Sequence, residues 1–141
     1  MQPEFITTDE PDPEDRNAVL TPLAAYNASK AGRPSDFRPL AILLRDPDSG
    51  AKIGGLWGRS YYDWLFVELL FVPETLRGQD IGTELMRRAE AVARERNCAG
   101  IWLDTFEFQA RGFYEKLGFS LFGQLDDHPR GSPQYFMQKR L

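Results

Sequence analysis

The chain has 141 residues, enough for one domain with a hydrophobic core and too few for two of ordinary size. Its formal net charge of -4 and its lack of a long apolar run argue against nucleic-acid and membrane binding, and the N-terminus has no signal-peptide pattern, so a cytoplasmic protein is expected. One cysteine and one histidine exclude an internal disulfide and form no zinc-binding pattern, so we expect no metal.

The N-terminal part contains one predicted strand and one predicted helix. Residues 4–8 (EFITT) are typical of a short edge strand. A helix is predicted from Asp12 or Pro13 through residue 31, because apolar side chains recur at helical spacing. Pro22 falls inside this segment, where a proline removes a backbone hydrogen bond. We therefore expect the helix to be kinked or broken there.

The middle of the chain alternates apolar runs with turns. Residues 40–46 and 52–62 flank the turn DPDSG and predict a hairpin, and a third strand over 64–72 should end at Pro73. A helix is predicted from Ile81, because apolar residues at positions 81, 85, 89 and 92 share one face. The remaining elements are then predicted in order: a buried strand over 101–106, a short helix over 109–117 closed by Gly118, and strands over 119–125 and 134–141. The order predicts an α+β fold.

The segment FVPETLRGQDIGTELM (71–86) joins the third strand to the long helix through a glycine-containing turn. The start of a helix presents unpaired backbone N–H groups, which bind phosphate, and glycine lets a ligand approach the backbone closely. Gly78 and Gly82 flank this start, Thr83 adds a hydroxyl, and Arg77 can pair with an anion. Neither of the best-known phosphate-loop patterns is present. The turn alone therefore indicates an anion site only weakly.

Two motifs together are more specific. The turn, followed about thirty residues later by FYEKLGF (113–119), resembles the GNAT superfamily of acetyl-CoA-dependent N-acetyltransferases. Arg77, Ile81 and Gly82 match the family pattern Q/R-x-x-G-x-G/A, but Asp80 stands where its first glycine usually lies. The resemblance implies one domain over 1–141, with a central mixed, mostly antiparallel, twisted sheet of six to seven strands. About four helices would flank this sheet, which would be splayed in its middle.

The resemblance also implies a site and a reaction. An acetyl group would pass from acetyl-CoA, as cosubstrate, to a primary amine that attacks directly in a ternary complex. Tyr114 matches the family's general acid, which protonates the thiolate of coenzyme A, and Glu68 lies where some members place a base that acts through a water. Tyr114 could instead be a core tyrosine, and Glu68 a solvent-facing strand residue. The residues implied at the cofactor are Leu70, Phe71, Val72, Arg77, Gly78, Gln79, Asp80, Ile81, Gly82 and Thr83.

Two positions depart from the family pattern. Aspartate tolerates a positive φ and can cap a helix, so we expect Asp80 to direct its carboxylate away from the phosphates and onto an N–H of the helix. Glu107 replaces an asparagine of many members, and its effect on coenzyme A binding is open. Cys98 is expected to be a structural thiol and His128 a solvated loop residue.

The acceptor is less constrained than the cofactor. Aromatic and acidic residues fall in or near the segments that form the acceptor pocket of similar proteins: Trp57, Tyr61, Tyr62, Asp63, Trp64, Asp126, Asp127, His128 and Tyr135. They favour a cationic small-molecule amine over a protein terminus. A non-catalytic module that senses acyl-CoA or binds a partner protein is the alternative, supported by Asp80 and Glu107. Exposed sheet edges also make a homodimer plausible.

Overall fold

The computed structural model describes residues 1–141, which contain six strands in one sheet, three α-helices and one 3-10 turn. The chain divides into two compact units, residues 1–35 and residues 36–141. The sheet lies entirely in the second unit. No helix is both long enough and apolar enough to cross a membrane.

The first unit contains helix α1, Pro13–Ala31, which begins and ends where its sequence predicts. The backbone N–H of Asp12 donates to the Asp15 carboxylate, and Gly32 ends the helix with a φ of 77°. The expected break at Pro22 is absent, since one continuous helix runs through it. The predicted strand over 4–8 is also wrong: these residues pair with no other strand, and a strand needs a partner for its backbone.

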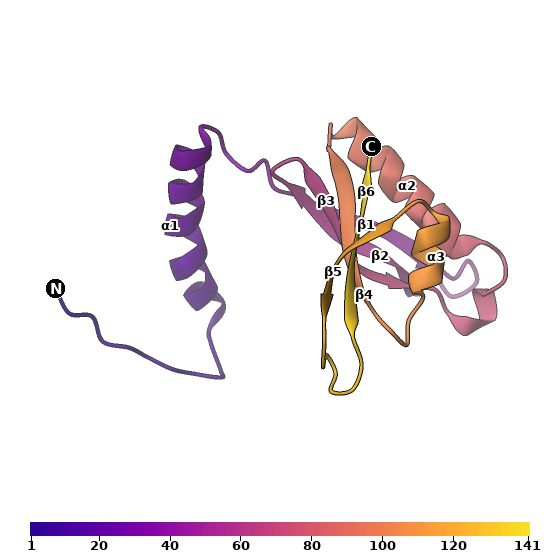
Figure 1. The fold of residues 1–141 in the computed structure, drawn as a ribbon, viewed down its shortest axis with the longest axis horizontal. Helices are drawn as coiled ribbons and strands as arrows, with labels where there is room; N and C mark the ends of the chain where they lie inside the picture. The colour runs from indigo at the N-terminus through magenta and orange to yellow at the C-terminus, as the bar shows by residue number, and fades with distance from the viewer. The chain divides into compact units, whose positions relative to one another are not determined.

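The second unit is built on a mixed, mostly antiparallel sheet in the order β1-β2-β3-β4-β6-β5 (Figure 1). Every neighbouring pair is antiparallel except β3 and β4, which are parallel and joined through a helix. The predicted hairpin, the third strand and the last three strands are all present. The strands are β1 (Arg38–Arg45), β2 (Lys52–Tyr61), β3 (Trp64–Phe71), β4 (Gly100–Phe106), β5 (Ser120–Leu125) and β6 (Gln134–Arg140).

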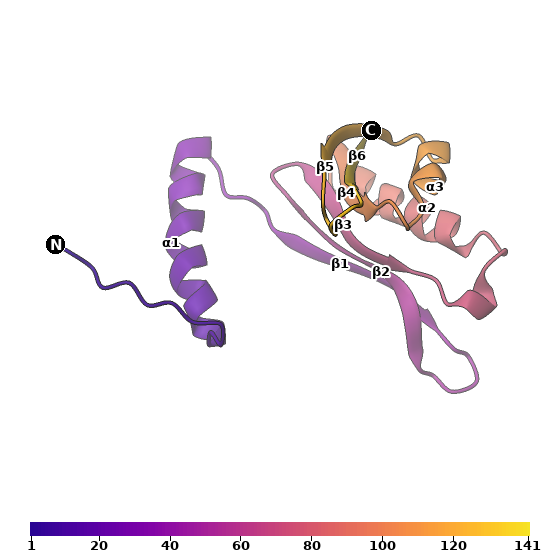
Figure 2. The same cartoon turned by 60° about the horizontal axis from the view of Figure 1, so that its bottom comes forward.

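Helices α2 (Ile81–Glu95) and α3 (Arg111–Lys116) lie on the same side of this sheet, as Figure 2 shows. The buried face of α2, which includes Leu85 and Ala89, packs on strand residues such as Leu56 and Leu103. Both helices occur where the sequence predicts, and Gly118 has the left-handed φ of 96° expected after α3. There are three α-helices rather than about four: α1 is one continuous helix through Pro22, and the segment before α2 forms only the 3-10 turn η1 (Glu74–Leu76).

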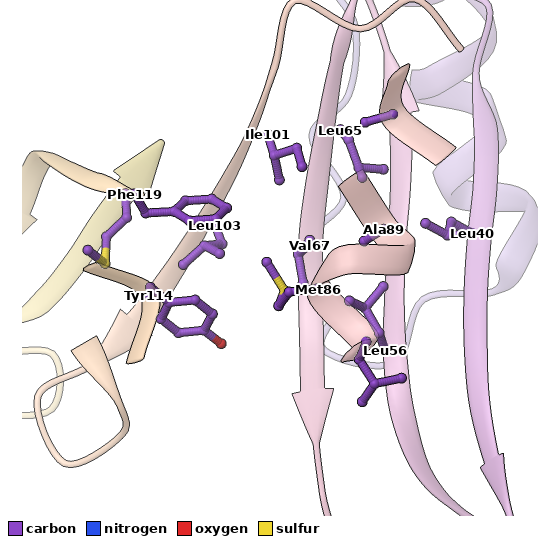
Figure 3. Close-up of a cluster of buried hydrophobic side chains, with 13 residues drawn as sticks. Leu40, Leu56, Leu65, Val67, Met86, Ala89, Ile101, Leu103, Tyr114 and Phe119 are labelled. Atoms are coloured by element: carbon purple, nitrogen blue, oxygen red, sulfur yellow. The ribbon is translucent and has the colours of Figure 1, made fainter. Parts of the chain in front are cut away.

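The sheet opens between β3 and β4. Their parallel pairing ends at Val67 and Leu103, and Glu68, the next residue of β3, is an extra residue without a partner on β2. Such a bulge bends a strand and ends its regular pairing, and bulges are frequent next to active sites. Figure 3 shows the strand that carries Ile101 and Leu103 diverging from the strand that carries Leu65 and Val67. The sheet is therefore splayed in its middle, as expected.

Candidate active site

A cleft of about 1070 Å³ lies at this opening. Its walls come from the end of β3, the turn and first residues of α2, the end of β4 and helix α3. Of the residues that the sequence places at the cofactor or in catalysis, all line the cleft except Gln79: Glu68, Leu70, Phe71, Val72, Arg77, Gly78, Asp80, Ile81, Gly82, Thr83 and Tyr114. The fold thus gathers residues that are up to 46 positions apart, from 68 to 114, around one space.

The turn before α2 presents free backbone donors to the cleft. Within the turn and the first helical residues, the N–H groups of residues 78–83 donate to no backbone or side-chain acceptor, and the first paired N–H is that of Glu84, which donates to the carbonyl of Asp80 at 3.0 Å. Gly78 adopts a φ of 82° that only glycine takes readily. Unpaired backbone donors and the positive end of a helix dipole are the features that bind anions at helix N-termini.

Asp80 behaves only partly as its sequence context predicts. It is the residue before the first helical residue, and its φ of 58° is the left-handed value expected for an aspartate that replaces glycine. Its side chain makes no capping hydrogen bond, so the capping prediction is wrong. A capping residue normally has an extended backbone, which lets its side-chain oxygen reach back to the helix, and the left-handed conformation of Asp80 does not provide this. Asp80 itself is one of the residues that line the cleft.

Arg77 connects the turn to the strand before it. Its Nε donates to the carbonyl oxygen of Val72 at 3.2 Å, across the 3-10 turn. This bond uses one of the five guanidinium N–H groups and leaves the others for an anion. Arg77 therefore links the turn to β3 by a hydrogen bond and keeps further N–H groups that could bind an anion.

Tyr114 projects from α3 with a buried ring and an accessible hydroxyl. Its side chain is 8% exposed and packs edge-on against Phe113 and Phe119. The hydroxyl makes no hydrogen bond. Every buried polar side-chain atom has a hydrogen-bond partner, so this hydroxyl is not fully buried, and Tyr114 lines the cleft. In Figure 3 the oxygen points toward the space between β4 and the strand of Val67. Burial, and then the charge of Asp104, raise the pKa of Tyr114 to about 12, which keeps the phenol protonated.

Glu68 lies across the cleft in an ion pair. Its Oε2 is 3.2 Å from Nη1 of Arg59, whose guanidinium also stacks over Phe66 at 4.8 Å. The ion pair occupies one of the two carboxylate oxygens. The second oxygen has no partner in the structure. Glu68 is thus both a structural strand residue and a cleft carboxylate.

Comparisons with known proteins agree with this arrangement. Residues 5–119 match the sequence profile of the Acetyltransferase (GNAT) family. The chain belongs to this family of acetyltransferases. The acetyltransferase is 40% identical to acetyltransferase Atu2258 of Agrobacterium fabrum, over 97% of this chain and 98% of that protein. It is also 40% identical to the blasticidin-S acetyltransferase of Streptomyces morookaense, over 75% of this chain and 80% of that protein. A crystal structure from Agrobacterium tumefaciens that was assigned as an acetyltransferase superposes with a TM-score of 0.90 at 40% identity, covering 98% and 99% of the two chains.

One ionisable residue that lines the cleft of the acetyltransferase, Asp104, was not predicted from the sequence. It lies on β4 beside Leu103, the last residue paired with β3, and it is half-buried. The sequence did contain a signal, because an acid in the otherwise apolar strand IWLDTF requires a reason. Asp104 lines the cleft because β3 and β4 separate directly after Leu103, which the sequence does not show.

None of the residues that the sequence suggested for the acceptor pocket lines this cleft of the acetyltransferase, and neither do Glu107 and Cys98; the acceptor candidates are Trp57, Tyr61, Tyr62, Asp63, Trp64, Asp126, Asp127, His128 and Tyr135. Glu107 accepts a hydrogen bond from the Ser132 hydroxyl at 3.3 Å, so it fastens the β4–α3 loop to the β5–β6 turn. His128 sits in that turn, with Nδ1 2.6 Å from Oε1 of Gln134. Burial raises the pKa of the Cys98 thiol, which suits an inert structural thiol.

Proposed function

We propose that the protein transfers an acetyl group from acetyl-CoA to the primary amine of a small molecule, by direct attack in a ternary complex. One observation carries the proposal: the unpaired N–H groups of residues 78–83 and the hydroxyl of Tyr114 open onto the same cleft. The first set suits a pyrophosphate and the second a leaving thiolate. Acetyl-CoA contains both groups, at opposite ends of its pantetheine arm.

The cofactor would extend along the free edge of β3. Leu70 and Phe71 pair with β2 on one side, and the edge that faces β4 is unpaired beyond Val67. A pantetheine arm has amide groups that can add to such an edge as a further strand does. Its pyrophosphate would rest on the N–H groups of Gly78 through Thr83, with Arg77 beside it. No metal is needed in this arrangement, since backbone donors and a guanidinium offset the phosphate charge.

The reaction requires one base and one acid. The neutral amine attacks the thioester carbonyl carbon, a C–N bond forms, and the tetrahedral oxyanion accepts a hydrogen bond from the N–H of Val72. When the C–S bond breaks, Tyr114 gives its proton to the thiolate sulfur, and the nitrogen releases its surplus proton, which restores the phenol through water. An alkyl ammonium must first lose a proton, and Glu68 would take it through a water. Close positioning of the two substrates supplies much of the rate.

The acceptor class follows from the surroundings of the cleft. Glu68 and Asp104 line the cleft together with the aromatic residues Phe106 and Phe108, and this combination favours a cationic amine. The relative from Streptomyces morookaense is named for blasticidin S, a small molecule, which supports a small acceptor rather than a protein terminus. The identity of the acceptor is independent of the proposed acetyl-CoA site. The competing acceptor is the amino terminus of a protein.

The test is an assay of coenzyme A release with acetyl-CoA and a panel of amines that includes blasticidin S, benzylamine, aliphatic diamines and an alanyl peptide. We expect turnover with small cationic amines and the mass of an N-acetyl product. Calorimetry with acetyl-CoA, run in parallel, should give binding in the micromolar range. Binding without turnover of any amine would favour the acyl-CoA sensor, and absence of binding would refute the cofactor site.

The assembly and location of the protein are also proposals. We propose a cytoplasmic enzyme in which residues 1–141 act as one domain, without nucleic-acid or membrane partners, and which forms a homodimer. Support for the dimer is an exposed apolar strip on the sheet face opposite α2, where Trp57 pairs with Leu69 and both are about half exposed or more, at 48% and 61%. Trp57→Glu and Leu69→Glu should each convert a dimer to a monomer in sedimentation experiments. A monomeric wild-type protein would refute the dimer.

A further inference from the structure

Asp104 stands where β3 and β4 separate, opposite Glu68. The last paired residues of the two strands are Val67 and Leu103, so Glu68 and Asp104 are the first residues beyond the pairing on each side. Both line the cleft. The carboxylates of Glu68 and Asp104 therefore lie on either side of the opening between β3 and β4.

Asp104 lies on the sheet face opposite α2. Side chains alternate along a strand, and Leu103 and Thr105 are both buried, so Asp104 points the other way, as Trp102 does. Tyr114 belongs to α3, which packs on the α2 face. Tyr114, the proposed acid, and Asp104 thus belong to opposite faces of the sheet. A cofactor bound at α2 and α3 would leave the Asp104 face free for the second substrate.

The carboxylate of Asp104 has no partner in the chain. It makes no hydrogen bond and no ion pair, whereas Glu68 pairs with Arg59 and the half-buried Glu90 pairs with Lys139. Its charge still reaches the cleft, because it acts on the Tyr114 phenol. The carboxylate of Asp104 is therefore available to pair with a bound cation.

Aromatic residues neighbour Asp104 along β4 and across the strand pair with β6. Trp102 and Phe106 lie two residues to either side on β4, and Phe136 is its cross-strand partner on β6. Trp102 stacks on Phe66 with ring centroids 4.1 Å apart. An ammonium group bound to a carboxylate between aromatic faces gains both charge-assisted hydrogen bonds and cation–π attraction.

We propose that Asp104 is the specificity-determining residue for the acceptor: it receives the ammonium group of a cationic amine on the face opposite α2 and positions its nitrogen at the opening between β3 and β4. The inference rests on the proposed function and names its acceptor class, small amines without an anionic group beside the nitrogen. Asp104 acts by binding and orientation. The proton that the amine loses goes to the water held by Glu68, and the bonds formed and broken are those of the acetyl transfer.

Asp104→Asn tests the inference, since it removes the charge and keeps the shape. We use the amine of the panel with the highest kcat/KM in the wild type. We expect its KM to rise tenfold or more, the KM for acetyl-CoA to stay within twofold, and Asp104→Glu to recover part of the loss. Glu107→Gln is the matched control, because Glu107 lies three residues away, outside the cleft, and glutamine can still accept from Ser132. It should change neither KM.

A neutral and a cationic amine together show whether Asp104→Asn acts through the charge of the acceptor or through a change in structure. An aromatic amine such as aniline is neutral at pH 7, so Asp104→Asn should raise its KM less than that of the cationic amine, and an equal rise would overturn the inference. An unchanged KM for the cationic amine would overturn it too. If the wild type acetylates no amine, the proposed function itself fails. Calorimetry with acetyl-CoA checks that the variant is folded, and a variant that no longer binds acetyl-CoA would contradict a role confined to the acceptor.

Discussion

The guanidinium of Arg77 donates a hydrogen bond to the carbonyl oxygen of Val72, 3.2 Å away, and so holds the turn before α2 against the end of β3. Both ends of the proposed cofactor path depend on this contact. The strand would carry the pantetheine arm, and the turn would carry the pyrophosphate. Their relative position is therefore set partly by a single side chain.

Arg77→Ala should weaken acetyl-CoA binding by about tenfold or more, because it removes both this tie and a cation beside the phosphates. Loss of one exposed hydrogen bond should cost only about 0.5–1.5 kcal/mol of unfolding free energy. Calorimetry and urea unfolding measure the two effects. Arg94→Ala, on the outer surface at the far end of α2, is the control. Equal acetyl-CoA affinity in Arg77→Ala and wild type would contradict a role for Arg77.

Asp80→Asn should tighten acetyl-CoA binding, by about tenfold, without loss of stability. Asp80 lines the cleft near the expected phosphates and its side chain makes no capping bond, so the substitution removes mainly a charge that would repel them, and asparagine also tolerates the left-handed backbone. Asp80→Gly should bind equally well and be unchanged or up to about 1 kcal/mol more stable. Asp80→Ala should be less stable than Asp80→Gly. Weaker binding in Asp80→Asn would mean that the carboxylate assists the cofactor.

Tyr114→Phe should lower kcat by about 100-fold and leave the KM for acetyl-CoA nearly unchanged, since the buried ring stays and only the proton donor is lost. Residual activity is expected because positioning persists. Steady-state kinetics measures both constants. Leu117→Met, a volume-conserving change at the end of the same helix, should retain kcat. Wild-type kcat in Tyr114→Phe would leave Tyr114 as a core residue only.

Tyr114 should also make stability depend on pH in alkali. Burial, and then Asp104, raise its pKa from 10.0 to about 12 in the folded state, which therefore binds the proton more tightly than the unfolded state does. Its contribution to stability is complete below about pH 10 and is lost as pH rises toward about 12. Urea unfolding at about pH 8 and about pH 11 should show a larger loss for wild type than for Tyr114→Phe. Parallel losses would contradict the raised pKa.

Glu90→Gln should destabilise the protein at neutral pH. Oε1 of Glu90 is 2.7 Å from Nζ of Lys139, which joins α2 to β6, and this hydrogen bond lowers the pKa of Glu90. The stabilisation is present above the ordinary glutamate pKa and is lost as pH falls through the lowered value. About 0.5–1 kcal/mol should be lost at pH 7, and the difference between wild type and variant should disappear in acid. A difference that persists in acid would point to lost packing.

The sequence by itself determined much of the local structure. Helix α2 follows from its apolar face beginning at Ile81, and the β1–β2 hairpin follows from two apolar runs around DPDSG. The two family motifs, 69–86 and 113–119, indicated the fold and brought Tyr114 and the glycine turn into one hypothesis. Both kinds of signal depend on residues close together in the chain, whose spacing is sufficient to predict them.

Only the tertiary structure decided the rest. The extra residue at Glu68 and the end of pairing at Leu103 depend on how β2, β3 and β4 pack, and the sequence IWLDTF does not reveal that its aspartate lies at an opening. Asp80 was expected to cap α2, but the left-handed backbone that it supplies takes its side chain away from that role. Strand register and backbone direction at a turn are set by contacts between distant residues, so the acceptor side of the site could not be predicted from local patterns.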